Sequence, residues 1–184
     1  MILKFVVLFL LYFIQALPYG FQSRYLPLIM RKEGASITSL GIFKLLLIPW
    51  ILKFFIATFI VDMYKTKRFW ILLTLFFLCF ISFFSSFLAF FIKFDFNDFS
   101  FYYIIAFILF NLNLFSSSND ICVDWLTMKI LSQEELGMGN TIQVSGFKLG
   151  TLFSGGLLVY FIDYITLDVG FFLFGVIYFI SFGL

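Results

Sequence analysis

Five ionisable side chains lie within long apolar stretches of this sequence, where an unpaired charge is costly. They are Lys44, Lys53, Asp120, Asp124 and Lys148. A Lys or Asp near the centre of a lipid bilayer costs roughly 3 kcal/mol on insertion scales, so each of them needs a charged partner or water. Side chains of these types mark ion or proton pathways in membranes, and that chemistry is the first hypothesis for them.

The two aspartates belong to a stripe of polar residues. At about 100° per residue of an α-helix, one narrow face carries Asn113, Ser116, Ser117, Asp120 and Asp124. Such a stripe must face protein or water and not lipid. Two carboxylates one helical turn apart also repel each other, which favours proton uptake by one of them and makes it a candidate proton carrier.

A broader polar arc follows further along the chain. Its members are Asn140, Thr141, Gln143, Lys148 and Thr151. Beside this arc runs a track of small residues, formed by Gly146, Gly150 and Ser154. Small residues at this spacing allow a neighbouring helix to approach closely, so we expect a tight helix contact there.

Depth in the membrane links the charged residues to one another. At ~1.5 Å per residue, Lys53 lies ~13 Å from Asp62 at the end of its helix, and Asp120 lies a similar distance from Lys129. Lys148 lies ~12 Å from the start of its own helix, measured from the same membrane face. Two cations and two anions at one depth can neutralise each other, which predicts a buried charge network in one half of the bilayer.

Two interpretations of this network stay open. The first is that the network only holds helices together. The second is functional: Asp120 or Asp124 takes up a proton or binds a cationic group, while Lys53 or Lys148 meets an anionic substrate.

The composition of the chain indicates which environment surrounds these apolar segments. The chain has 184 residues, of which 63% are hydrophobic and 12% charged, and its mean hydropathy is +1.11. A soluble domain of this size could not hide so much apolar surface, so lipid is expected to cover it. The net charge of +2 is too small to suggest a nucleic-acid partner. The absence of His excludes His-dependent catalysis and the common zinc sites, and we expect no enzyme activity, cofactor or metal.

The pattern of apolar segments predicts an all-α membrane protein, a bundle of six transmembrane helices. A helix needs ~20 mostly apolar residues to cross ~30 Å of hydrocarbon, and unpaired backbone groups are too costly in lipid for other structures. The predicted spans are Ile2 to Tyr19, Ser39 to Val61, Phe69 to Lys93, Phe101 to Ile130, Asn140 to Ile162 and Asp168 to Leu184. Short polar connectors separate them, among them Arg24 to Thr38 and Leu131 to Gly139. In the second span, Pro49 and Trp50 are interpreted as a kink and a packing contact.

Several motifs in order resemble signatures of the major facilitator superfamily. They are Gln15-Ala16-Leu17-Pro18-Tyr19-Gly20, then Pro49-Trp50 with Lys53 and Asp62, then Asn119-Asp120-Ile121-Cys122-Val123-Asp124. The branch that this chain resembles holds acetyl-CoA transporters, the bacterial muropeptide permease of the AmpG type and the major facilitator superfamily domain-containing protein 3 group. The stretch from Glu135 to Gln143, continuing to Lys148-Leu149-Gly150, is most similar to that last group.

The resemblance implies alternating access by two six-helix halves, with cytoplasmic termini and a solute held between the halves. The polar faces of helices one, four and five would line the cavity. The candidate substrate and coupling residues are Gln15, Tyr19, Lys53, Asn113, Ser117, Asp120, Asp124, Gln143 and Lys148. The candidate conformational loop between helices two and three carries Asp62, Lys67 and Arg68.

The leading hypothesis is therefore transport of an organic solute, with anions and first of all acetyl-CoA to be tested. The six spans would correspond to one half of a transporter, either a fragment, which we favour, or a half that pairs with a second copy. The partners expected are a small-molecule solute, membrane lipid and the missing carboxy-terminal half or that second copy. The rivals are a non-transporting assembly partner or degenerate half-transporter, and a membrane enzyme that uses the Asp pair with a metal.

Overall fold

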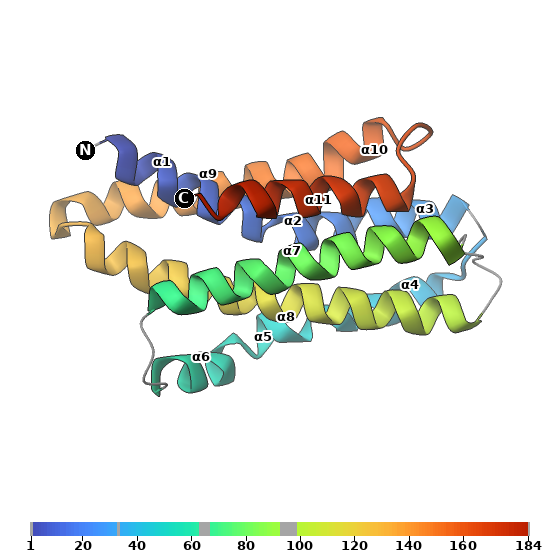
Figure 1. Ribbon diagram of the computed structural model, residues 1–184, viewed down its shortest axis with the longest axis horizontal. Helices are drawn as coiled ribbons and strands as arrows, with labels where there is room; N and C mark the ends of the chain where they lie inside the picture. The colour runs from blue at the N-terminus through green and yellow to red at the C-terminus, as the bar shows by residue number, and fades with distance from the viewer. Residues whose placement is uncertain (1, 33, 63–66, 93–98, 184) are drawn as a thin grey trace.

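The structure of this chain is a computed structural model that describes residues 2–32, 34–62, 67–92 and 99–183. Within these ranges the chain is almost entirely helical and contains no strand. The helices form an elongated bundle, shown in Figure 1. The predicted all-α membrane fold is confirmed, because the described residues include five helical segments long and apolar enough to span a membrane and one shorter apolar helix.

The first span is a broken helix that extends further than its apolar pattern. Its parts are α1 (Ile2–Gln15), α2 (Leu17–Gly20), a π-helical turn (Phe21–Tyr25) and α3 (Leu26–Lys32). The helix thus continues past Tyr19, and the predicted connector from Arg24 is helical as far as Lys32. Pro18 lies in α2 and Pro27 in α3, and the bundle tolerates both residues through local irregular turns.

The second span is interrupted in the middle. It consists of α4 (Ile37–Lys44), a 3₁₀ turn (Leu45–Leu47), α5 (Ile48–Ile51) and α6 (Lys53–Asp62). Pro49 has no N–H for the carbonyl of Leu45, and the turn before it tightens to 3₁₀ geometry. The predicted kink at Pro49 is confirmed, and it leaves Lys53 at the first position of α6.

The third, fourth and sixth spans agree closely with their apolar patterns. They are α7 (Lys67–Ile92), α8 (Phe99–Ile130) and α11 (Leu167–Ser181). In Figure 1, α11 lies along α7, and α7 lies beside α8, as their packing contacts also show. With 15 residues, α11 reaches ~22 Å and is shorter than the ~30 Å hydrocarbon core.

The fifth span begins earlier than predicted. A 3₁₀ turn (Gln133–Glu135) leads into α9 (Leu136–Leu152), a second π-helical turn (Phe153–Leu157) and α10 (Leu158–Tyr160). The predicted connector Leu131 to Gly139 is therefore largely helical. The cause is a capping box, in which the Glu135 carboxylate accepts a hydrogen bond from the Ser132 backbone N–H at 3.0 Å.

The first and fifth spans pack closely along their whole length (Figure 1). A Cβ added to Gly146 would lie 2.9 Å from the carbonyl oxygen of Phe9, and one added to Gly150 would collide with the carbonyl of Phe13. Near the second π turn, a Cβ on Gly155 would lie 2.7 Å from the carbonyl oxygen of Gly20. The tight contact predicted from the small-residue track is confirmed.

Ion pairs join the same two spans at both ends. Lys4 Nζ lies 2.5 Å from Glu135 Oε2 at one end, and Lys32 Nζ lies 2.5 Å from Asp163 Oδ1 at the other. The first and fifth spans therefore form one closely packed pair of helices, against which the interrupted second span and α8 place their polar side chains.

Candidate functional site

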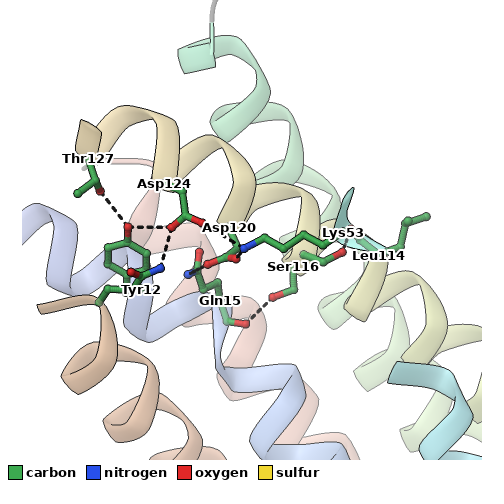
Figure 2. A network of polar contacts seen from close by, with 10 residues as sticks. Tyr12, Gln15, Lys53, Leu114, Ser116, Asp120, Asp124 and Thr127 are labelled. Carbon is green, nitrogen blue, oxygen red and sulfur yellow. Dashed lines mark hydrogen bonds and ion pairs between the residues drawn. The ribbon is translucent and has the colours of Figure 1, made fainter. Parts of the chain in front are cut away.

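Three of the charged residues predicted to share one depth meet inside the bundle. Lys53 Nζ forms an ion pair with Asp120 and a second one with Asp124, whose Oδ2 lies 3.1 Å away. Figure 2 shows the ammonium group between the two carboxylates. This triad of Lys53, Asp120 and Asp124, called the charge triad below, joins the second span to the fourth.

Helix geometry explains how the charge triad forms. Asp120 and Asp124 are separated by one turn of α8, so their carboxylates point the same way. The helix breaks at Leu52, between α5 and α6, so that α6 begins at Lys53, whose side chain reaches α8. Asp120 is only 5% exposed, whereas Lys53 and Asp124 each keep 32% of their side-chain surface exposed. The charge triad is thus buried at Asp120 and open at Asp124.

The first span completes the hydrogen bonds of both carboxylates. The Gln15 amide donates to Asp120 Oδ1, and the Tyr12 hydroxyl lies 3.0 Å from Asp124 Oδ1. Tyr12 also lies 3.0 Å from the hydroxyl of Thr127, one turn beyond Asp124 on α8. In the view of Figure 2, Tyr12 approaches the carboxylates from the side opposite Lys53.

The fifth span supplies a further donor to the same site. Gln143 Nε2 donates to Asp124 Oδ1 at 2.8 Å. Together with the first, second and fourth spans, it makes the charge triad a meeting point of four spans. Each carboxylate therefore accepts bonds from neutral and charged donors, which offsets much of the cost of placing charge in an apolar bundle.

A second hydrogen-bond chain begins at the indole of the second span. Trp50 Nε1 donates to Asn113 Oδ1 at 3.0 Å. Asn113 Nδ2 donates to the carbonyl of Leu109 at 2.8 Å and to the amide oxygen of Gln22. Gln22 in turn donates to the carbonyl of Phe43 at 2.7 Å. This chain fixes the orientation of the Trp50 ring.

An open hollow of about 290 Å³ adjoins the charge triad. Its lining residues are Trp50, Asp120, Gln143, Val144, Phe147 and Lys148. Behind it the rings of Tyr19, Trp50 and Phe147 contact one another, with centroid separations of 5.6 to 6.3 Å. The hollow thus combines an aromatic wall, a carboxylate and a lysine.

Lys148 does not join the charge triad. It lines the hollow together with Asp120, yet it is exposed and has no hydrogen-bond or ion-pair partner among the described residues. The prediction of four mutually neutralised charges is wrong in this respect. Lys53 pairs with both carboxylates, and Lys148 lines the open hollow beside them.

The other predicted residues divide into several groups. Asn113 and Ser117 are fully buried, and the Ser117 hydroxyl donates back to the Leu114 carbonyl at 3.0 Å, so neither borders the hollow. Tyr19 is half-buried in the aromatic wall. In the candidate conformational loop, Arg68 is exposed, whereas residues 63–66 and the side chains of Asp62 and Lys67 lie outside the described residues.

Sequence reasoning missed several members of the site. Tyr12 and Phe147 lie in apolar segments, whereas Gln22 lies beside the polar residues Ser23 and Arg24. Tyr12 and Gln22 recur at helical spacing with the predicted residues Gln15 and Tyr19, and this periodicity is the signal that could have found them. Trp50 was interpreted as a packing contact, although its position three residues before Lys53 places it on the same side of the interrupted helix. What marks Trp50 as a member of the site is its hydrogen bond to Asn113 of the polar stripe, and this contact is visible only in the tertiary structure.

The arrangement can bind a charged organic molecule more readily than a metal ion. Both carboxylates of the charge triad are taken up by the Lys53 ammonium and by amide and hydroxyl donors. Within the described ranges, no group of three His, Cys, Asp or Glu side chains gathers where it could hold a metal. The lining of the hollow includes the exposed ammonium of Lys148, a group that favours an anion.

Comparisons with known proteins point to one family. A family model described as acetyl-coenzyme A transporter 1 matches residues 4–168. The chain is also similar to a Haemophilus influenzae protein described as uncharacterized, with 28% identity over 153 residues. That alignment covers 80% of this chain and 34% of the relative, so the chain spans about a third of the length of that protein.

Proposed function

The chain belongs to the acetyl-coenzyme A transporter 1 family, and from this premise we propose that it forms part of a transporter for an organic anion of the acetyl-CoA type. It is an integral, multi-pass membrane protein, with five membrane-competent helices and a shorter one among its described residues. The family favours a transport role over a catalytic one.

The observation that carries the proposal is the polar layer inside the bundle. The charge triad joins the second and fourth spans and accepts hydrogen bonds from the first and fifth, and an open hollow with a lysine lies beside it. Ionisable residues in membrane spans are expensive and mark solute or ion pathways more often than other positions do. A network built only to join helices would not need an exposed ammonium at its edge that has no ion-pair partner among the residues described.

The proposed mechanism is alternating access of the kind used by the major facilitator superfamily. The polar faces of the first, fourth and fifth spans would line one side of the path, as the hydrogen bonds between them suggest. A carboxy-terminal half or a second copy of this chain would form the other side and cover the hollow. The broken first, second and fifth spans are consistent with such a fold, because irregular helices border substrate sites in transporters.

Each charged residue has a proposed role. Lys148 meets the anionic group of the solute, because Lys53 is already held by two carboxylates. Asp120 or Asp124 takes up a proton or binds a cationic group during the cycle. Asp124 is the better placed for exchange, since 32% of its side chain is exposed and only 7% of that of Asp120 is.

Uptake of labelled acetyl-CoA tests the proposal directly. The full-length protein in proteoliposomes is expected to accumulate the label, and Asp124→Asn is expected to lower the initial rate about tenfold, because a charge-assisted set of hydrogen bonds is lost. The matched control is Asp163→Asn, which removes an exposed carboxylate at the far end of the fifth span.

Two results would count against the proposal. No accumulation of acetyl-CoA by the full-length protein would remove this solute class, and equal uptake by Asp124→Asn and the wild type would remove Asp124 from the mechanism. Protein that neither binds nor moves any solute, even as a dimer, would favour the non-transporting role.

A further inference from the structure

We infer that the hollow beside the charge triad recognises a flat aromatic ring together with a nearby anionic group. Its solute would therefore be held by a nucleotide-like portion and not by an acyl group. This inference rests on the proposed transport function and specifies the solute class of the same site. It assigns Trp50 and Phe147 to ring recognition and Lys148 to recognition of the anion.

The aromatic wall is the first observation. Tyr19, Trp50 and Phe147 come from three different spans, and each ring lies within contact distance of the other two. Trp50 and Phe147 also line the hollow itself. Ring faces are the part of a protein on which a planar base stacks, and such stacking tolerates different bases. An aromatic wall at a polar, charged site therefore favours a solute that has a ring.

The orientation of Trp50 is the second observation. Its indole N–H is held by Asn113, which is fully buried and bound in turn by Gln22 and by the carbonyl of Leu109. A ring that is fixed before the solute arrives loses little conformational freedom on binding. Asn113 and Gln22 are thus positioning residues, since they act on the solute only through Trp50.

The charge at the rim of the hollow is the third observation. Lys148 is exposed, lines the hollow and has no ion-pair partner among the described residues. A lysine ammonium binds phosphate groups as a point charge. Asp120 lies in the same lining but is bridged by Lys53, so the anion meets Lys148 next to a carboxylate that is already paired.

The size of the hollow limits how much of a solute it can hold. Its volume of about 290 Å³ lies at the lower end of the ~300–1,000 Å³ that is usual for small-molecule sites. A base and one anionic group fit this space, whereas a whole coenzyme A thioester does not. The acyl end would lie outside the hollow, and solutes that differ only in that end would bind it equally well.

Direct binding to the purified full-length protein in detergent tests the inference. The probes are radiolabelled ADP, which has a ring and an anion, and unlabelled adenosine and inorganic pyrophosphate, which have one each. ADP is expected to bind at least about tenfold more tightly than either competitor, because stacking and ion pairing add.

Four variants separate the two contributions. Trp50→Leu is expected to weaken ADP about tenfold and leave pyrophosphate unchanged, and Lys148→Gln to weaken ADP and pyrophosphate and leave adenosine unchanged. Trp50→Phe keeps a ring without the Asn113 bond and should retain more ADP binding than Trp50→Leu. Lys129→Gln is the matched control, because Lys129 is exposed at the end of α8 and does not line the hollow.

Specific results would overturn the inference. One is ADP binding no tighter than pyrophosphate, and another is Trp50→Leu weakening ADP and pyrophosphate in the same proportion, which marks a packing role. If Trp50→Leu does not fold, an unchanged ratio of ADP to adenosine affinity in Lys148→Gln overturns it equally.

The binding test and the uptake test fail independently. If the protein prefers ADP but does not accumulate acetyl-CoA, the proposed function is ruled out and recognition of a ring together with an anion is supported. If the protein takes up acetyl-CoA but does not prefer ADP to pyrophosphate, the proposed function is supported and this inference is ruled out.

Discussion

Lys53 is the residue on which the stability of the polar layer depends most. Its ammonium is the counter-charge of both Asp120 and Asp124, and these carboxylates have neutral donors otherwise. Removing one partner of a buried ion pair leaves an uncompensated charge, which is far more costly than removing the whole pair.

Lys53→Gln is therefore expected to lower the free energy of unfolding by about 2 kcal/mol, less than for a fully buried pair because Lys53 and Asp124 are partly exposed. Thermal unfolding in detergent measures the change. The triple variant Lys53→Gln, Asp120→Asn, Asp124→Asn should recover much of it. Lys32→Gln, which breaks an exposed pair, should cost less than ~1 kcal/mol. Equal effects of Lys53→Gln and Lys32→Gln would contradict this account.

The sequence predicts the buried triad better than the hollow. Asp120 and Asp124 share a helical face by spacing alone, and the cost of charge in lipid makes a cation partner necessary. The partner could not be chosen between Lys53 and Lys148, because both lie at the same calculated depth. The choice depends on the interrupted course of the second span, in which α6 begins at Lys53 after a break at Leu52 and Lys53 reaches α8.

The first and fifth spans form a close helix contact through their small residues. Gly150 lies against the Phe13 carbonyl, where no side chain fits without movement of backbone. Gly137 lies in the same helix with nothing within 4 Å of an added Cβ. These two glycines therefore form a matched pair for testing the contact.

Gly150→Ala is expected to destabilise the protein by about 2 kcal/mol, since it forces two backbones apart. Gly137→Ala should be neutral or stabilise by a few tenths of a kcal/mol, because alanine favours the helix. The midpoint of thermal unfolding of each variant gives the comparison. Similar midpoints for the two variants would show that the first and fifth spans do not pack as closely as described.

Helix positions follow from the apolar pattern, whereas helix ends depend on local chemistry. α7 and α8 match their predicted spans closely, α7 because it is an almost continuous apolar run and α8 because its polar residues lie within a long, mainly apolar segment. The first helical span continues beyond its predicted end at Tyr19, because Pro18 and Pro27 are accommodated by irregular turns and do not end the helix. The start of the fifth span was misplaced because the Ser132 and Glu135 capping box lies outside the apolar stretch.

An ion pair lies at each end of the packed first and fifth spans, and the two pairs distinguish the two ends of the molecule. The Lys4 and Glu135 pair lies at one end of the packed first and fifth spans, and the Lys32 and Asp163 pair lies at the other. If these spans cross the bilayer, the two pairs face opposite aqueous compartments. The native thiols, Cys79 and Cys122, are buried and should react little with a water-soluble reagent.

Single cysteines at the two ends test this topology. Lys4→Cys and Glu134→Cys are expected to react with a membrane-impermeant thiol reagent from one side of sealed vesicles. Lys32→Cys and Asp163→Cys should react only from the other side. Labelling of residues 4 and 32 from the same side would contradict the assignment of the first helix as a membrane span.

Protection of the hollow by solute is the most direct test of the central claim, that an anion of the acetyl-CoA type binds beside the charge triad. Val144 lines the hollow and is 44% exposed, while Met138 is 56% exposed near the start of the same helix and does not line it. Acetyl-CoA should slow the thiol labelling of Val144→Cys several-fold and leave that of Met138→Cys unchanged. Labelling of Val144→Cys at the same rate with and without acetyl-CoA would contradict the claim.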